Sequence, residues 1–291
     1  MASTETRART LSSVESRVML DLEWRGQRRV TTADLRLLLG GSDSHARVVA
    51  HRLVRKGWLE PLKRGLFLVV PADRGPEGIP DTNPLAVGAE LAAPSFYSYA
   101  TACSFHHLTE QAFMTMYLVC QRAQRATLVR DTRYVFVRVN EPRFFGFERV
   151  DVLGAKVDMA SLERAVLDAV DQPRHAGGIG EVSRIVRNAA ARVSWPSLIA
   201  HAERWGESAI VQRLGYLLDL HAAKLDERTR ERLHRLVLPD NKIFLGDRKR
   251  WGTSGKLVAE WGIVENVPRD VLVERGEGAR RPMMLPKRVT P

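Results

Sequence analysis

The sequence is poor in cysteine and has no long apolar run, and both absences narrow the class of protein. Cys103 and Cys120 are the only cysteines in 291 residues, too few for a disulfide framework or a structural zinc site, which fits a reducing compartment. No apolar stretch approaches the ~20 residues that a helix needs to cross a bilayer. The N-terminus, MASTETRARTLSS, has no apolar segment of a secretory signal. We therefore expect a cytoplasmic protein that has no membrane partner.

The sequence also lacks a recognisable catalytic or metal-binding constellation. Gly40-Gly41-Ser42 resembles a nucleotidyltransferase signature, but no carboxylate pair follows to hold two Mg²⁺ ions. His106-His107 with Glu110 is a poor metal site, because adjacent histidines point to different sides of a helix. The segment 252–256 lacks the spacer and the hydroxyl residue of a phosphate-binding loop, so we expect a turn there. We assign no catalytic, cofactor-binding or metal-binding residue and no cofactor, and we expect no enzymatic activity.

What the chain does have is an excess of positive charge. Its formal net charge is +11, which favours a polyanionic partner such as nucleic acid or an acidic lipid surface. An arginine-rich composition inherited from a GC-rich genome is an alternative source of this charge. The excess is concentrated, however: residues 25–74 hold eleven Arg and Lys against four Asp and Glu, which is +7 in fifty residues. Most of the charge therefore lies in one N-terminal module.

The order of elements expected in that module is the order of a winged helix-turn-helix. Apolar spacing, capping residues and glycines predict each element. They are a helix from Ser12 or Ser13 to about Trp24, a short strand at Val30, a helix capped by Thr32 and running through Leu39, a turn at Gly40-Gly41, a helix capped by Ser42 or Asp43 and ending at Gly57, and a hairpin of Trp58–Leu62 and Gly65–Val70 joined by Lys63-Arg64. Such a module places one helix in a DNA groove and its hairpin, the wing, on flanking phosphates.

The third helix is expected to be apolar on one face and basic on the other. Ala46, Val49, Leu53 and Val54 can face a core. The opposite face would read bases near the start of the helix and contact phosphates near its end. The candidate DNA-binding residues of the module are Thr31, Thr32, Ser42, Ser44, His45, Arg47, Val48, His51, Arg52, Arg55, Lys56, Lys63 and Arg64. Two alternatives remain open: the basic face is merely solvated, or the winged module docks a protein.

The rest of the chain predicts a second, larger domain. Four prolines and two glycines in Pro71–Pro84 indicate a linker. β-prone runs follow at Met114–Cys120, Ala126–Val129, Tyr134–Val139 and Glu148–Val152. Amphipathic helices bounded by Gly, Ser or Pro come next, including one that Ser161 caps. The fold class is therefore α+β, with a winged helix-turn-helix followed by a mixed domain whose C-terminal half is helical. The expected division is a flexible leader at 1–11, the winged domain at 12–72, the linker at 73–83 and the α+β domain at 84–291.

Four segments resemble the AbiEi-like antitoxins of type IV toxin–antitoxin systems. They are LEPLKRGLFLV at Leu59–Val69, SYATACSFHHLTEQ at Ser98–Gln111, MASLERAVLDAVDQPRHAGGIGEV at Met159–Val182, and RLGYLLD at Arg213–Asp219. Each motif alone is weak, but the four occur in the family's order. The chain departs from the pattern at His107, where a glycine is common. The residues themselves also allow a plain structural explanation, in which Arg164 and Asp168 form an i,i+4 pair beside a buried stripe.

The resemblance implies a transcriptional autorepressor that is also an antitoxin. Its winged domain would bind its own operator, double-stranded DNA arranged as inverted repeats. Its second domain would counteract a co-encoded nucleotidyltransferase-like toxin, with or without direct contact. For the antitoxin surface we expect exposed basic side chains, namely Arg164, Arg184, Arg187 and Arg213. The alternatives are a ligand-responsive winged-helix transcription factor and a nucleic-acid-processing enzyme that the winged module targets to its substrate.

Overall fold

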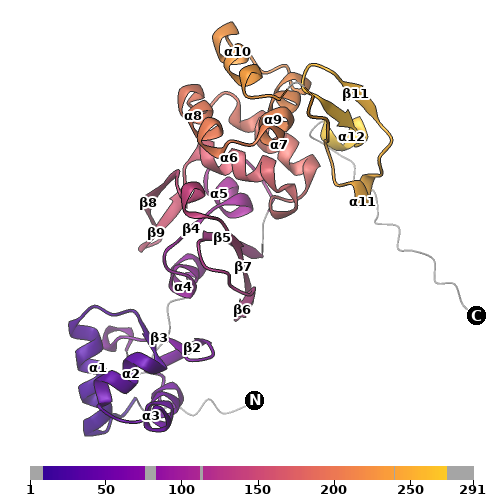
Figure 1. The fold of residues 1–291 in the computed structure, drawn as a ribbon. Coiled ribbons are helices and arrows are strands. Elements are labelled where there is room, and N and C mark those ends of the chain that lie inside the picture. The colour runs from indigo at the N-terminus through magenta and orange to yellow at the C-terminus, as the bar shows by residue number, and fades with distance from the viewer. Residues whose placement is uncertain (1–8, 76–82, 112–113, 239, 274–291) are drawn as a thin grey trace, which may run out of the picture.

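The computed structural model describes residues 9–75, 83–111, 114–238 and 240–273. Within them the chain forms a small N-terminal domain and a larger mixed domain, which confirms the α+β class (Figure 1). The small domain has its own hydrophobic core, built around Leu22, Leu35 and Leu53. No helix in the described ranges is both long and apolar enough to cross a membrane.

The small domain has the predicted order of elements. They are α1 (Ser13–Trp24), β1 (Arg29–Thr31), α2 (Thr32–Leu39), α3 (Asp43–Arg55), β2 (Leu59–Lys63) and β3 (Leu66–Val69). The three strands form one antiparallel sheet in the order β1-β3-β2. This is a winged helix-turn-helix, with the β2–β3 hairpin as the wing.

Side chains just before each helix explain where the helices begin. Ser12 and Glu15 form a capping box at α1, so the expected start of that helix is correct. At α2 the cap is Thr31, which forms a capping box with Asp34, and the prediction of Thr32 as the cap is wrong by one residue. Ser42 caps α3 as predicted. Gly40 ends α2 with a φ of 60°, a backbone conformation that glycine adopts at little cost.

The wing differs from its prediction in one important way. Its turn is formed by Arg64 and Gly65 instead of Lys63-Arg64. In the register of β2 against β3, Pro61 pairs with Phe67 and Lys63 with Leu66, so Leu62 is skipped by a bulge. A bulge bends its strand and re-aims a side chain, and here Leu62 is buried against the core of the larger domain.

Beyond Leu62, further contacts join the wing to the larger domain. Leu66 and Leu68 of β3 belong to the same core cluster as Leu62. Arg130, in the turn after β6 (Thr127–Val129), forms an ion pair with Glu60 of β2, with 2.7 Å between Nη2 and Oε2. The wing therefore packs against the larger domain. The two domains are in direct contact, in addition to being connected by the expected linker. Of that linker, residues 76–82 lie outside the described residues.

The larger domain is centred on a six-stranded sheet in the order β6-β7-β5-β4-β9-β8. The β5–β7 and β4–β9 pairs are parallel, and the other neighbours are antiparallel. The strands are β4 (Ser95–Tyr97), β5 (Thr115–Cys120), β6 (Thr127–Val129), β7 (Thr132–Arg138), β8 (Phe147–Val152) and β9 (Ala155–Ala160). Neither β4 nor β9 was predicted from the sequence.

Helices occupy most of the second half of the domain, as expected. These are α6 (Leu162–Asp171), α7 (Ile179–Ala189), α8 (Trp195–Trp205), α9 (Ser208–Leu220) and α10 (Glu227–Arg235). Two helices lie in the first half of the domain, α4 (Pro84–Leu91) and α5 (Tyr99–Phe105). Short 3-10 turns lie at 141–143 and 173–175, and another lies before the domain at 72–74. Helix α6 is central, because it packs against α5, α7, α8 and α9. Ser161 caps it as predicted, by accepting a hydrogen bond from the backbone N–H of Arg164.

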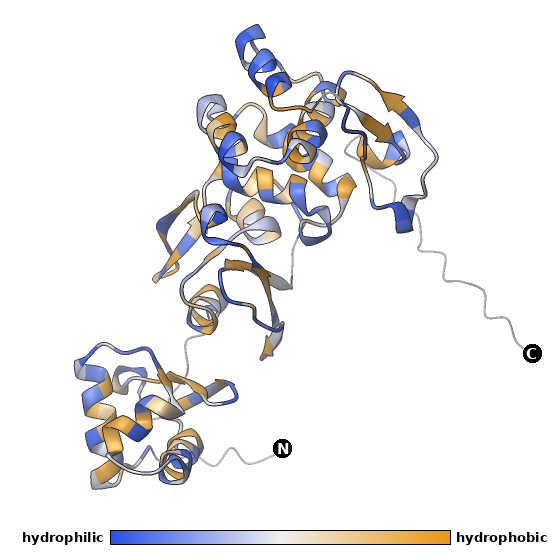
Figure 2. Cartoon of the chain, viewed as in Figure 1, coloured by the Kyte–Doolittle hydropathy of each residue, from blue (hydrophilic) through white to orange (hydrophobic). Residues whose placement is uncertain are grey.

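A small subdomain ends the described chain. It comprises β10 (Ile243–Phe244), α11 (Arg248–Trp251), β11 (Lys256–Val258), β12 (Ile263–Glu265) and α12 (Arg269–Leu272). Its three strands are ordered β10-β12-β11. The apolar residues of α6, α7 and α9 lie where the helices meet, whereas α10 and α11 are largely hydrophilic (Figure 2). Of the predicted turn at 252–256, residues 252–255 lie between α11 and β11, and Lys256 begins the strand.

The expected flexible leader at 1–11 is anchored at its described end. The guanidinium of Arg9 stacks 3.8 Å above the Trp58 ring and donates hydrogen bonds to the backbone oxygens of Val70, Pro71 and Gly75. These contacts fasten the chain before α1 to the end of the wing. Residues 1–8 lie outside the described residues.

Candidate nucleic-acid interface

The outer face of α3 is exposed and basic, as its sequence pattern predicts. Ala46, Val49 and Leu53 are buried in the domain core. Each predicted residue of the opposite face is exposed, namely Ser42, Ser44, His45, Arg47, Val48, His51, Arg52 and Arg55. Among the described residues, Arg47, Arg52 and Arg55 have no ion-pair partner on the protein. Three guanidinium groups therefore stay free to meet an anion.

A groove of about 700 Å³ runs between α2, α3 and the wing. Arg36, Arg47 and His51 lie along its helical walls, and Arg64 lies at the turn of the wing. One carboxylate, Asp43, lines it too and is paired with Arg36 at 3.3 Å. The groove thus joins the helix expected in the DNA groove with the wing expected on the flanking backbone.

The two threonines at the start of α2 lie differently from one another. The Thr31 hydroxyl is used within the protein, since it accepts from the Asp34 backbone N–H and donates to the Asp34 carboxylate. Thr32 lines the groove, and its backbone N–H donates to the Gly65 oxygen in the wing turn at 3.0 Å. Of the pair, Thr32 is the one that lines the groove, and its hydroxyl makes no hydrogen bond to any described residue.

Lys56 was predicted to contact a phosphate, but its side chain is ion-paired within the protein. Its Nζ lies 2.5 Å from Oε2 of Glu15, a residue of α1 that is only 2% exposed. Burial works to raise the pKa of Glu15, but hydrogen bonds from Lys56 and Ser12 outweigh it and hold that pKa below its ordinary value. Lys56 therefore joins α3 to α1.

Lys63 is likewise held away from the groove. Its ammonium donates to the backbone oxygen of Leu91 at 3.0 Å and to Oε1 of Gln124 at 2.9 Å, both in the larger domain. Burial, aided by the nearby charge of Arg29, lowers the pKa of Lys63. The sequence of the wing did not predict this contact. A lysine in an interface cannot be distinguished from an exposed lysine by the sequence pattern alone.

The basic residues expected on an antitoxin surface do not form one surface. Arg164 was expected to be exposed, which is wrong: it is completely buried. Arg213 is partly buried, and burial lowers its pKa despite the attraction of Asp171 and Glu207. Arg184 is ion-paired with Glu181 of its own helix. Of the four, only Arg187 is exposed.

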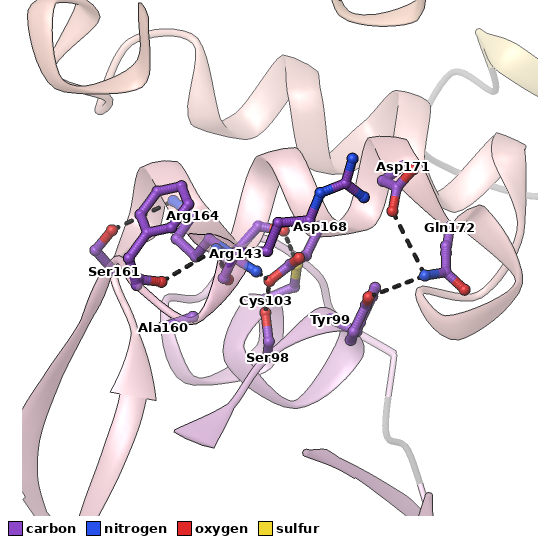
Figure 3. Close-up of polar contacts among 12 residues, drawn as sticks. Ser98, Tyr99, Cys103, Arg143, Ala160, Ser161, Arg164, Asp168, Asp171 and Gln172 are labelled. Atoms are coloured by element: carbon purple, nitrogen blue, oxygen red, sulfur yellow. Dashed lines mark hydrogen bonds and ion pairs between the residues drawn. The ribbon is translucent and has the colours of Figure 1, made fainter. Parts of the chain in front are cut away.

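Arg164 instead belongs to a buried polar cluster inside the larger domain. Its Nε lies 2.9 Å from Oδ2 of Asp168, so the predicted i,i+4 pair is present (Figure 3). Ser98 donates to the same carboxylate oxygen at 2.5 Å, and Nη1 of Arg164 donates to the backbone oxygens of Arg143 and Phe145. The cluster ties α6 to the start of α5 and to the segment before β8.

His107 stands where the resembled family commonly has glycine, and its backbone explains that preference. It has a φ of 55°, in the left-handed region that favours glycine. The preceding residue, His106, hydrogen-bonds the backbone oxygen of Ala160 through Nε2 at 2.7 Å. Both histidines thus have structural roles at the end of α5. No group of three potential metal-ligating side chains occurs in the part of the chain described here.

Comparison with protein-family models gives a match to the N-terminal domain. Residues 17–70 match the family described as "Transcriptional regulator, AbiEi antitoxin". The winged domain is therefore similar to the domain that this family model describes. The matched segment holds α2, α3 and the wing, the elements that line the groove, and it confirms the resemblance drawn from the sequence for this domain. This match supports, in general terms, a role as a transcriptional regulator or antitoxin.

The similarity of the fold extends along the whole chain. The crystal structure of the RV2827C protein from Mycobacterium tuberculosis superposes with a TM-score of 0.60 at 16% sequence identity. The alignment covers 94% of this chain and 98% of that one. At this identity the likeness shows a shared fold. None of the curated proteins compared with the chain matches it.

Proposed function

We propose that the chain is a DNA-binding transcriptional autorepressor and the antitoxin of a type IV toxin–antitoxin system. The observation that carries the DNA-binding part is the groove between α2, α3 and the wing, with Arg47, His51 and Arg64 on its walls. Arg52 and Arg55 extend the exposed positive charge along α3 beyond it. The family match to residues 17–70 supports a regulatory role for this domain.

In this proposal α3 enters the major groove of the operator. The N-terminal half of the helix reads base edges: Ser44, His45 and Arg47 offer donors, and Val48 offers an apolar contact for a thymine methyl group. Arg52, Arg55 and Arg64 neutralise phosphates, and Thr32 bonds one from the start of α2. Lys56 and Lys63 are left out of the contact set, because their ammonium groups bind Glu15 and Leu91.

The test is binding of a labelled fragment of the chain's own promoter, measured by fluorescence anisotropy. The double variant Arg47→Ala, Arg52→Ala is expected to weaken binding at least about 30-fold at moderate salt, since it removes two cationic contacts. The matched control is Arg17→Ala on α1 with Arg25→Ala just after it, which removes the same charge outside the groove and leaves affinity within about threefold. Equal losses in the two double variants would show that net charge alone drives binding.

The antitoxin part rests on the resemblance and on the AbiEi-type domain. The proposed partner is a co-encoded nucleotidyltransferase-like toxin, counteracted with or without direct contact. Co-expression with the neighbouring gene tests it: the full chain is expected to restore growth that the neighbour's product arrests. If the neighbour does not slow growth, or if the chain fails to relieve it, the antitoxin part is wrong.

A second candidate is a ligand-responsive regulator. It is favoured by a pocket of about 520 Å³ in the larger domain, which lies apart from the groove on the winged domain. A pocket of this size is typical of small-molecule sites.

A further inference from the structure

The pocket in the larger domain is built where four segments meet. They are the end of α6 with the turn after it, the start of α7, the middle of α9, and the loop that carries α11. Figure 1 shows α7, α9 and α11 at the opposite end of the molecule from α3. Its volume of about 520 Å³ lies within the usual range of about 300–1,000 Å³ for a bound small molecule.

Three guanidinium groups line this pocket. Arg213 makes no hydrogen bond or ion pair with any described residue, and its Nε is buried without a partner. Arg250 also has no ion-pair partner in the described chain, and its guanidinium lies 5.0 Å from the centre of the Trp251 ring. Arg174 bonds to Gln172 and His175. Burying a guanidinium N–H without a hydrogen-bond partner is costly. A bound anion would give Nε of Arg213 the acceptor that it lacks.

The start of α7 adds donors to the same side of the pocket. Gly178, the residue before this eleven-residue helix, has no side chain to cap it, and the first backbone N–H groups of a helix have no partner within it. Gly178 has a φ of 92°, and Nη1 of Arg250 lies 3.9 Å from the position that a Cβ atom would take there. The uncapped helix end and Arg250 therefore lie next to each other, and both attract negative charge.

The rest of the lining is aromatic and apolar. Trp251 packs its indole edge against Gly246, and Ile179 and Leu245 are buried beside the pocket. Two carboxylates lie among these residues. Asp247 accepts from the backbone N–H of Lys249 at 2.7 Å, and Asp171 accepts a weaker hydrogen bond from Gln172. Oxygen acceptors beside a flat apolar wall suit hydroxyl and amine donors of a ligand that also carries an anionic end.

We propose that this pocket binds a nucleoside monophosphate, with its phosphate on Arg213, Arg250 and the start of α7 and its base against Trp251. Inorganic phosphate would leave most of the volume empty, and an uncharged nucleoside would leave the guanidinium groups unpaired. A nucleoside monophosphate would be the chemical class of ligand for the ligand-responsive regulator, the second candidate function. The pocket proposal requires no DNA binding, so it stands or falls separately from the regulator proposal.

The experiment is isothermal titration calorimetry on the full chain without DNA or phosphate buffer. The probes are AMP, GMP, CMP and UMP, each compared with its nucleoside and with inorganic phosphate. At least one nucleotide is expected to bind ten-fold or more tightly than its nucleoside and than phosphate. Arg213→Gln and Arg250→Gln are each expected to weaken that binding at least ten-fold, and Trp251→Leu to remove the preference for nucleotide over phosphate.

Controls separate a lost contact from a lost fold. Arg228→Gln on α10 removes an exposed arginine outside the pocket and should leave nucleotide affinity unchanged. Arg250 is itself exposed, so its variant remains folded by circular dichroism even where Arg213→Gln does not. The proposal is overturned if no nucleotide binds at millimolar concentration, if phosphate binds as tightly as every nucleotide, or if folded Arg250→Gln keeps full affinity.

Discussion

The Nζ atom of Lys63 lies 3.0 Å from the backbone oxygen of Leu91, so the wing of the winged domain is bonded to the end of α4 in the larger domain. The next residue, Arg64, lines the groove beside α3. Two adjacent basic residues of one hairpin thus have different surroundings: Lys63 contacts the larger domain, and Arg64 lines the groove. That groove is where we propose that the operator binds.

This division predicts different effects for two neighbouring substitutions. Arg64→Ala is expected to lower the magnitude of the salt dependence of promoter binding by about 1 in log–log slope, since it removes one phosphate contact. Lys63→Ala should leave that slope unchanged, because the ammonium it removes is bonded within the chain. Anisotropy titrations at several salt concentrations measure both slopes. Equal changes in the two variants would place Lys63 on the DNA.

A similar contrast is expected at the end of α3. Lys56→Met leaves the buried Glu15 carboxylate without its partner, and we expect a loss of about 1–3 kcal/mol in the free energy of unfolding. Arg55→Met removes an exposed charge and should cost less than about 0.5 kcal/mol, while weakening promoter binding. Urea denaturation and anisotropy together test the pair. A stable Lys56→Met protein that binds the promoter poorly would contradict the assignment.

The buried pair of Arg164 and Asp168 predicts a large effect on stability. Both side chains have no exposure to solvent, so Arg164→Met leaves an uncompensated buried carboxylate and should cost about 3–5 kcal/mol. The double variant Arg164→Met, Asp168→Leu is expected to recover much of this loss, because it removes both buried charges. Arg187→Met, at an exposed position of α7, is the control. A small effect of the single variant would mean that water reaches the pair.

His175 predicts a dependence of stability on pH. Burial, aided by the charge of Arg174, lowers its pKa from 6.5 to about 4. Between these values the unfolded chain binds a proton that the folded chain does not, so stability rises with pH. Its contribution is present above about pH 6.5 and is lost as pH falls towards 4. Because the ring is partly exposed, we expect a change of about 1–2 kcal/mol, less than the full shift implies.

The measurement is urea unfolding between pH 4 and pH 7.5 in the parent chain and in His175→Gln, which cannot titrate. The pH dependence of the variant should be shallower by the amount that His175 contributes. His201 and His221 also have lowered pKa values, for which burial is the main cause, so a residual slope is expected. Identical slopes in the two proteins would exclude His175 as a contributor.

Local signals predicted the winged domain well. The caps Ser12 and Ser42 and the glycine after α2 act within a few residues, so the sequence shows them directly. The cap of α2 was misplaced because Thr31 and Thr32 carry the same hydroxyl, and the capping box with Asp34 selects Thr31. The basic face of α3 followed from helical spacing alone.

Features that depend on distant parts of the chain were missed. The strand β4 has only three residues, and its pairing with β9 joins residues that are far apart in sequence, as at Tyr97 and Met159. An Arg–Asp pair at i,i+4 has the same spacing on a surface helix and inside a core, so the burial of Arg164 had no sequence signal. The contact of Lys63 with Leu91 was hidden for the same reason.

The most direct test of the account is the salt dependence of binding to the chain's own promoter. With about three to four cationic contacts from α3 and the wing, the slope of log K against log salt is expected to be about −3 to −4. Binding that is independent of salt, or no binding to that promoter at low salt, would contradict the claim that the exposed arginines of α3 and the wing bind a DNA backbone.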